Sequence, residues 1–164
     1  MKENLAGIED YTRIGSLLQP EQIVKYGELT LRENQIAYAE PSFFRLFDFE
    51  LLKGDKKTCL SMPGQVVITE RIASKYFKDE DPIGKIFIFT GAYDKISCEV
   101  TGVMKEMPSN SHIHYSFLIS YKSLPKYMQE YWYKHEAYTY VLLDSPERKA
   151  EIEREFPVMY MRVG

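Results

Sequence analysis

The sequence has no long hydrophobic run, and this absence limits what the chain does by itself. A helix that spans a bilayer needs about 20 apolar residues, whereas the best runs here are residues 86–89 and 138–143. No apolar segment follows residues 1–4, so the pattern of a secretory signal peptide is missing too. Taken literally, these features describe a soluble cytosolic protein, although a domain cut from a longer membrane protein has the same pattern.

Cysteine and excess positive charge are also scarce. The only cysteines are Cys59 and Cys98, too few for a disulfide framework, and the sequence leaves open whether they pair or remain small buried thiols. Lysine and arginine number 21 against 24 aspartates and glutamates, which gives a net charge of −3. A protein that neutralises nucleic-acid phosphates needs a basic excess, so we expect no nucleic-acid partner.

Motifs that hold nucleotides or activate nucleophiles are absent from the sequence. It contains neither G-x-G-x-x-G nor G-x-x-x-x-G-K-[ST], which cradle phosphates, and no G-x-S-x-G nucleophile elbow. The acidic run at residues 79–81 lies between Lys78 and Lys85, which is typical of a solvated turn. We therefore expect no catalytic residue, metal or cofactor in this chain, and a binding or mechanical role.

Apolar and aromatic residues are abundant enough for a folded core. The 164 residues are 45% hydrophobic, and 13 tyrosines and 9 phenylalanines supply most of the aromatic content. Neither a linker nor an internal repeat divides the chain, so residues 1–164 are expected to form one contiguous domain.

Periodicity predicts an α+β fold. Alternation over residues 23–32 and at Ile36 and Tyr38 predicts a hairpin that turns at residues 33–34. In residues 96–104, every second side chain, from Ile96 to Met104, is expected on one face of a strand. The other predicted strands are 66–68, 86–89, 115–121 and 137–143, and short helices are expected after Pro41, after the N-cap Thr69, at 123–131 and at 145–156. This irregular mixture favours a mixed, mostly antiparallel sheet with short helices, in one lobe or two.

Three histidines leave a metal site as one alternative. In a strand, His112 and His114 would point to the same side, as two metal ligands do. A third ligand would have to come from His135 or Glu136, and zinc sites usually show tighter ligand clusters. A polar segment before a strand is the favoured explanation of the pair, and a metal-dependent soluble enzyme is the less favoured alternative hypothesis.

An aromatic cluster leaves a second alternative. Tyr127, Tyr131, Trp132 and Tyr133 form either a contact patch or the end of a helix that packs on the sheet. As a patch, they would belong to a soluble module that binds peptide or lipid. Trp132 is the candidate contact residue.

Several sequence blocks resemble a known family. Residues 39–55 read AEPSFFRLFDFELLKGD and residues 66–85 read VVITERIASKYFKDEDPIGK. Residues 100–103 read VTGV, residues 108–112 read PSNSH and residues 138–143 read YTYVLL. In this order and spacing, the blocks resemble the MacB-like periplasmic core domain of FtsX-, MacB- and LolC-type ABC transporter permeases.

The matching positions are fold-defining, because they anchor helices or permit turns. They are Pro41, Phe43, Phe44, Phe47, Gly54, Thr69, Ala73, Phe77, Pro82, Gly84, Gly102, Pro108 and Ser111. The resemblance therefore implies an architecture and not an active site.

The resemblance implies a non-catalytic domain on the periplasmic side of the inner membrane, between the first and second membrane helices of a permease. ATP would bind a separate ATPase domain or subunit, whose hydrolysis would move or gate a substrate or partner outside the membrane, as in efflux or in peptide and lipoprotein export. Expected partners are this ATPase, the rest of the permease and a membrane-fusion or outer-membrane protein. The isolated domain is expected to be a monomer or a weak dimer. Family members have chain before residue 8 and beyond residue 160, so we expect a truncated segment.

Overall fold

The computed structural model describes residues 7–15, 21–91, 95–130 and 137–154. Its strands are β1 (Ile8–Gly15), β2 (Gln22–Tyr26), β3 (Leu29–Glu33), β4 (Ile36–Ala39), β5 (Leu51–Lys53), β6 (Gln65–Thr69), β7 (Ile86–Thr90), β8 (Lys95–Met104), β9 (Phe117–Ser120) and β10 (Ala137–Leu143). Its helices are α1 (Phe43–Leu46), α2 (Glu70–Phe77) and α3 (Lys126–Glu130), with 3-10 turns η1 (Tyr121–Ser123) and η2 (Pro146–Arg148).

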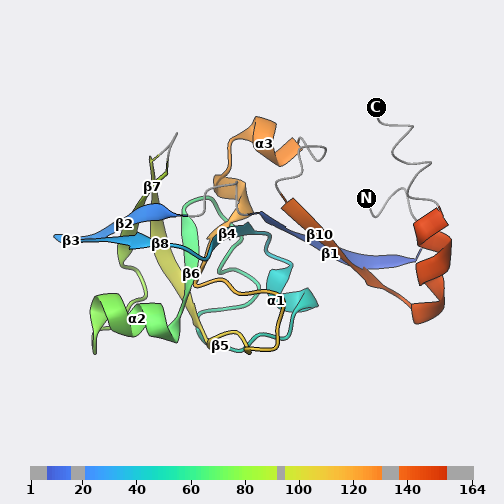
Figure 1. The fold of residues 1–164 in the computed structure, drawn as a ribbon, viewed down its shortest axis with the longest axis horizontal. Coiled ribbons are helices and arrows are strands. Elements are labelled where there is room, and N and C mark those ends of the chain that lie inside the picture. The colour runs from blue at the N-terminus through green and yellow to red at the C-terminus, as the bar shows by residue number, and fades with distance from the viewer. Residues whose placement is uncertain (1–6, 16–20, 92–94, 131–136, 155–164) are drawn as a thin grey trace.

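One ten-stranded sheet runs through the molecule, with short helices beside it (Figure 1). The strand order is β10-β1-β4-β9-β6-β8-β7-β2-β3, and β5 pairs with β8 beside this path. Among the pairs that the described residues form, β4–β9 and β6–β8 are parallel and the others are antiparallel. The predicted α+β fold with a mixed, mostly antiparallel sheet is confirmed.

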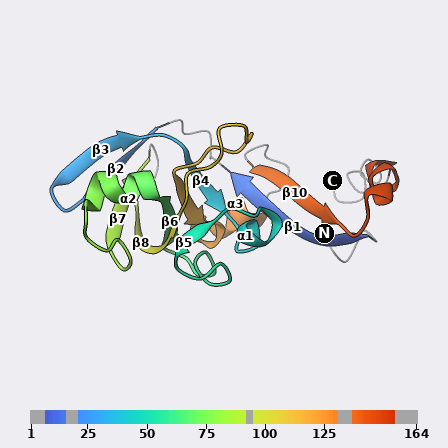
Figure 2. The same cartoon turned by 90° about the horizontal axis from the view of Figure 1, so that it is seen from below.

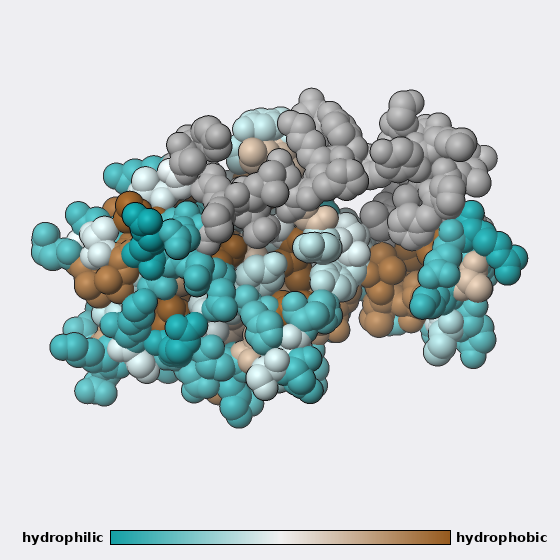
Figure 3. Space-filling model, viewed as in Figure 1, coloured by the Kyte–Doolittle hydropathy of each residue, from teal (hydrophilic) through white to brown (hydrophobic). Residues whose placement is uncertain are grey.

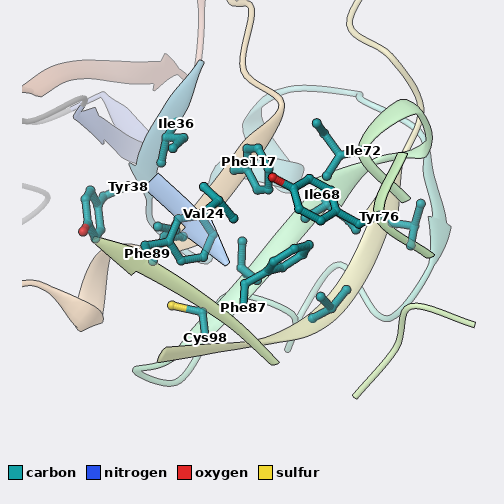
Figure 4. Packing of buried hydrophobic residues seen from close by; sticks show 14 of the residues in the cluster. Val24, Ile36, Tyr38, Ile68, Ile72, Tyr76, Phe87, Phe89, Cys98 and Phe117 are labelled. Carbon is teal, nitrogen blue, oxygen red and sulfur yellow. The ribbon is translucent and has the colours of Figure 1, made fainter. Parts of the chain in front are cut away.

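The central strands β4, β6 and β9 are buried on both faces, which gives the molecule two cores. Ile68 and Phe117 point to one face, where Ile72 of α2 packs among them (Figure 4). Val67 and Leu118 point to the opposite face, where α1 and the loops around it contribute the covering side chains. The sheet is therefore the middle of three layers.

Helix α2 begins where the sequence predicts. Thr69 has extended backbone angles, and its hydroxyl accepts a hydrogen bond from the amide of Ile72, as an N-cap residue does. In the second turn, Lys75 and the Tyr76 hydroxyl both donate to the buried carboxylate of Glu33, at 2.6 and 2.8 Å. These two bonds tie the end of β3 to α2.

The predicted position of the first hairpin turn is wrong. Residues 23–32 form two paired strands, β2 and β3, which turn at Gly27 with a φ of +55°. Strand β4 then leaves this hairpin and pairs with β1 and β9. Because the turn is two residues long, the alternation of side chains continues through it without interruption. The sequence pattern of β2 and β3 therefore looks like that of one continuous strand.

The predicted single apolar face of β8 is wrong beyond Val100. Thr101 has no partner in β6, so it is an extra residue in β8. As a result, Val103 shares a core with Val100, whereas Met104 lies in the opposite core. A β-bulge exchanges the faces of all residues after it.

The remaining predicted elements agree with expectation in type, with ends that differ by a few residues, and β5 is a strand that the sequence did not predict. The strand expected at 115–121 is β9, and the helix expected at 123–131 is α3. The last expected helix begins as η2 and continues as α-helix over residues 149–154, while Phe156 lies outside the described residues. None of the helices in the described part is long and apolar enough to cross a bilayer.

Candidate functional site

Strands β1 and β10 form a two-stranded ribbon that extends beyond the body, which is the remaining sheet with its helices (Figures 1 and 2). β1 pairs with β10 over its whole length, but in the described residues it pairs with β4 at Ile14 and Gly15 alone. We call this junction the root of the ribbon. An isolated pair of strands is marginally stable in water, so the contacts at the root decide how firmly the ribbon is held.

One face of the ribbon packs on the segment that contains α1. The Tyr140 ring meets the Phe47 ring edge to face, with centroids 5.0 Å apart. Asp10, which is 6% exposed, forms an ion pair with Arg45. Since a buried carboxylate without a partner is unfavourable, this pair holds the ribbon to the helix as long as both residues are charged.

Arg13 holds the opposite face of the ribbon. Its Nε donates to Glu40 at the end of β4 at 2.7 Å, and a terminal nitrogen donates to the carbonyl of Gln129 in α3 at 2.7 Å. The guanidinium also lies 4.3 Å from the ring centre of Tyr121, in the range of a cation–π contact. One side chain therefore connects β1 to β4, η1 and α3.

A hollow of about 400 Å³ lies beside the root. It is lined by Ile14 of β1, Tyr138 and Tyr140 of β10, and His112, Ile113 and Tyr115 of the loop before β9. We call it the tyrosine hollow. Its size is that of pockets that hold small molecules, and the described residues that line it include no Asp, Glu, Lys or Arg.

The polar side chains that the described residues place around the tyrosine hollow are phenols and an imidazole. Burial raises the pKa of Tyr115, and the neighbouring hydroxyls of Tyr140 and Tyr138 add to the rise. Burial also raises the pKa of Tyr140, whose hydroxyl lies 3.0 Å from Nε2 of His112. Both phenols can donate and accept hydrogen bonds at neutral pH, which suits an uncharged, partly apolar group.

The two histidines lie in the loop before β9 and not in a strand. His112 and His114 are both exposed, and His112 contacts Tyr140. Within the described ranges, no group of three His, Cys, Asp or Glu side chains could hold a metal ion. His135 and Glu136 lie outside these ranges, as does Trp132, so the aromatic contact patch stays a prediction.

Both cysteines are buried and free, one in each core. Burial raises the pKa of Cys59 to about 11 and the pKa of Cys98 to about 12, so both are protonated thiols at neutral pH. The acidic run at residues 79–81 is exposed, and its Glu80 and Asp81 pair with Lys85 and Lys53. The interpretation of this run as a solvated turn is confirmed.

The residues of the family motif lie in the body and do not line the tyrosine hollow. Phe43 and Phe44 are buried in the core around α1, and Gly54 and Gly84 have φ angles of +95° and +81°. The other motif residues lie in strands, helices and turns of the body: Pro41, Phe47, Thr69, Ala73, Phe77, Pro82, Gly102, Pro108 and Ser111.

The sequence does not predict the tyrosine hollow, because its lining comes from three separate segments. One local signal was present: Tyr138 and Tyr140 are two residues apart in a predicted strand, so they share a face. The third tyrosine, Tyr115, gave no such signal. Its position beside the other two depends on the path of the loop before β9.

Comparisons with known proteins agree with this architecture. A family model described as the MacB-like periplasmic core domain matches residues 1–157. A solved domain of a permease protein from Porphyromonas gingivalis is 26% identical, with a TM-score of 0.73 over 94% of this chain and 72% of that chain. No curated protein sequence matches.

Two further solved structures share the fold at lower identity. The periplasmic region of MacB from Actinobacillus actinomycetemcomitans is 16% identical, with a TM-score of 0.68 over 97% of this chain and 70% of that chain. The extracellular domain of the ABC-type transporter YknZ from Gram-positive bacteria is 15% identical, with a TM-score of 0.61 over 91% and 72%. Because the family model covers nearly the whole sequence, the chain belongs to the MacB-like periplasmic core domain family and is a periplasmic domain of an ABC transporter permease.

Proposed function

We propose that this domain couples ATP hydrolysis in the cytoplasm to movement outside the membrane, as the part of a permease between its first and second membrane helices. The observation that supports this proposal most directly is the ribbon. Its strands are the first and last described strands, and their outer ends lie side by side, where the Asp144 amide donates to the Gly7 carbonyl at 3.1 Å. Membrane helices that continue from these ends would act on the body through the ribbon.

The root contacts support transmission of this movement. Arg13 holds one face of the ribbon, and the Asp10–Arg45 pair with the Tyr140–Phe47 contact holds the other. Contacts on both faces oppose bending in both directions. A displacement of the membrane helices would therefore move ribbon and body as one unit.

In this proposal the domain performs no chemistry itself. ATP binds a separate ATPase domain or subunit, and the movement of the permease serves efflux or the export of peptides or lipoproteins. A membrane-fusion or outer-membrane protein is the partner class outside the membrane, and the isolated domain is a monomer or a weak dimer.

The first test is the complete reading frame together with its accessibility in cells. We expect one membrane helix before this segment, further membrane helices after it, and an ATPase in the same or a neighbouring frame. Met62 is 59% exposed and both native cysteines are buried, so Met62→Cys provides one reactive thiol. A membrane-impermeant maleimide should label it in intact spheroplasts. Labelling only after lysis would contradict the proposal.

A further inference from the structure

Three tyrosine rings line the tyrosine hollow, and contacts with other residues hold two of them in place. Tyr140 packs edge to face on Phe47 with ring centres 5.0 Å apart, and its hydroxyl lies 3.0 Å from Nε2 of His112. The backbone amide of Tyr115 donates to the sulfur of Met107 at 3.3 Å. These aromatic walls are therefore in position before any ligand binds.

The third ring lies at the mouth of the hollow. Tyr138 is 72% exposed, whereas Ile14 and Ile113, which also line the hollow, are 1% and 3% exposed. The two isoleucines therefore form a buried apolar floor. Figure 3 shows hydrophobic side chains over the ribbon, to the right of the body. A ligand that enters past Tyr138 meets aromatic rings at the sides and apolar groups below.

We propose that the tyrosine hollow binds a quaternary ammonium group, such as the trimethylammonium group of choline, against the rings of Tyr115, Tyr138 and Tyr140. The face of an aromatic ring attracts a cation, and cages of several aromatic side chains recognise quaternary ammonium ligands in this way. Choline carries this group both as a free molecule and as the headgroup of phosphatidylcholine. The proposal goes beyond the coupling function above and does not rest on it.

The hollow also has room and partners for the polar part of such a ligand. Its volume of about 400 Å³ is in the range of pockets that hold small molecules. His112 is exposed beside the Tyr140 hydroxyl, and an imidazole and a phenol can each donate or accept a hydrogen bond. The hydroxyl of choline, or the phosphate of the lipid headgroup, therefore finds hydrogen-bond partners there while the rings hold the cation.

A quaternary ammonium group fits these walls better than a primary one. A primary ammonium group is compact and strongly hydrated, and its three N–H donors each need an acceptor. A trimethylammonium group presents methyl groups, which pack against aromatic rings and against Ile14 and Ile113 without needing acceptors. Its desolvation therefore costs less, while its attraction to the rings is retained. We expect choline to bind more tightly than ethanolamine.

The first test is calorimetric titration of the 164-residue chain with choline at neutral pH. Ethanolamine and the neutral carbon analogue of choline, a dimethylbutanol, are the comparison ligands. The analogue has the shape and apolar contacts of choline but no charge. We expect choline to bind with a Kd below about 1 mM, and both comparison ligands to bind at least about tenfold more weakly.

Substitutions of tyrosine separate the ring from the hydroxyl. Tyr140→Phe keeps the ring, so the affinity for choline should fall less than about threefold, whereas Tyr140→Leu should lower it at least about tenfold. Because Tyr140 also contacts Phe47, Tyr138→Leu provides a second ring deletion, at an exposed position, with the same expected loss. Tyr127→Leu in α3, where the side chain is 54% exposed, is the matched control outside the hollow and should leave the affinity unchanged. Circular dichroism checks that each variant is folded.

Vesicles distinguish the two sources of the ligand. Binding to phosphatidylcholine vesicles that exceeds binding to phosphatidylglycerol vesicles, and that Tyr138→Leu abolishes, would identify the lipid headgroup. Binding of free choline without such vesicle binding would identify a soluble ligand. Either result supports the inference.

Three results would overturn the inference: no binding of choline or of phosphatidylcholine vesicles, equal binding of choline and its neutral analogue, or equal losses in Tyr138→Leu and Tyr127→Leu. Ligand binding by the purified chain does not depend on where the domain lies in a cell. Failure of the maleimide test would therefore leave this result standing, so the two proposals fail separately.

Discussion

At the scale of single residues, close approach of backbone segments explains one position of the family motif, Gly54. Gly54 directly follows β5 and has a φ of +95°, and an ideal Cβ there would lie 2.4 Å from the carbonyl oxygen of Thr101 and 3.0 Å from the Cα of Gly102. This contact occurs where the extra residue of β8 meets β5. Glycine is needed at position 54 because the φ is positive and because a Cβ would have no space beside β8.

A pair of glycine variants separates these two effects. Gly54→Ala should lower the free energy of unfolding by about 3 kcal/mol, because backbone strain and overpacking add. Gly84→Ala is the control, since its φ is +81° but nothing lies within 4 Å of its ideal Cβ, and it should lose only about 1 kcal/mol. Urea denaturation measures both, and equal losses would show that the contact with β8 does not matter.

The buried thiols predict a stability that depends on alkaline pH. Folding raises the pKa of Cys59 from 9.0 to about 11 and that of Cys98 from 9.0 to about 12. Their protonated forms therefore stabilise the folded state fully below pH 9, and this contribution is lost as the pH rises through the folded pKa values.

The reactivity of the two cysteine thiols measures the same burial. At pH 8, a disulfide reagent should react slowly with both native cysteines and rapidly once urea unfolds the chain. Met62→Cys, at an exposed position, provides a fast-reacting control in the folded protein. Rapid reaction of Cys59 or Cys98 in the native wild-type chain would contradict their burial.

At the scale of elements, the ribbon depends on its root. Arg13→Ala removes the partner of Glu40, whose side chain is 13% exposed, and should lower the free energy of unfolding by about 2 kcal/mol. Amide exchange should accelerate more in β10 than in the central strand β6. Arg32→Ala breaks an exposed pair with Glu21 and should change stability by less than about 1 kcal/mol. Equal exchange in β6 and β10 would mean that Arg13 does not act on the ribbon.

The sequence predicts most elements but not how they are joined. Periodicity located most strands, because each alternates or is short and apolar, but it did not locate β5, and the N-cap at Thr69 marked α2. The turn at Gly27 preserves the alternation of side chains between the two faces, and the extra residue Thr101 reverses it. Neither leaves a local signal in the sequence. Strand partners far apart in sequence, such as β1 with β10, depend on tertiary packing, and so does the tyrosine hollow between them.

At the scale of the whole molecule, a body with a core on each side of the sheet carries one projecting ribbon (Figure 2). We expect this unit to move without internal rearrangement. Spin labels on Met62→Cys in the body and Leu142→Cys in the ribbon should give the same distance distribution with and without ATP in the full-length permease. Arg13→Ala should broaden it. A distance in the wild-type permease that changes with nucleotide would show a hinge at the root.

In the proposed function, ATP hydrolysis moves this domain relative to the membrane. The most direct measurement is energy transfer from a fluorophore on Met62→Cys to acceptors on lipid headgroups, in the full-length permease with its ATPase in nanodiscs. We expect the transfer to change when ATP is added, and an ATPase variant unable to bind ATP to abolish the change. Transfer that stays constant during measured ATP turnover would contradict it.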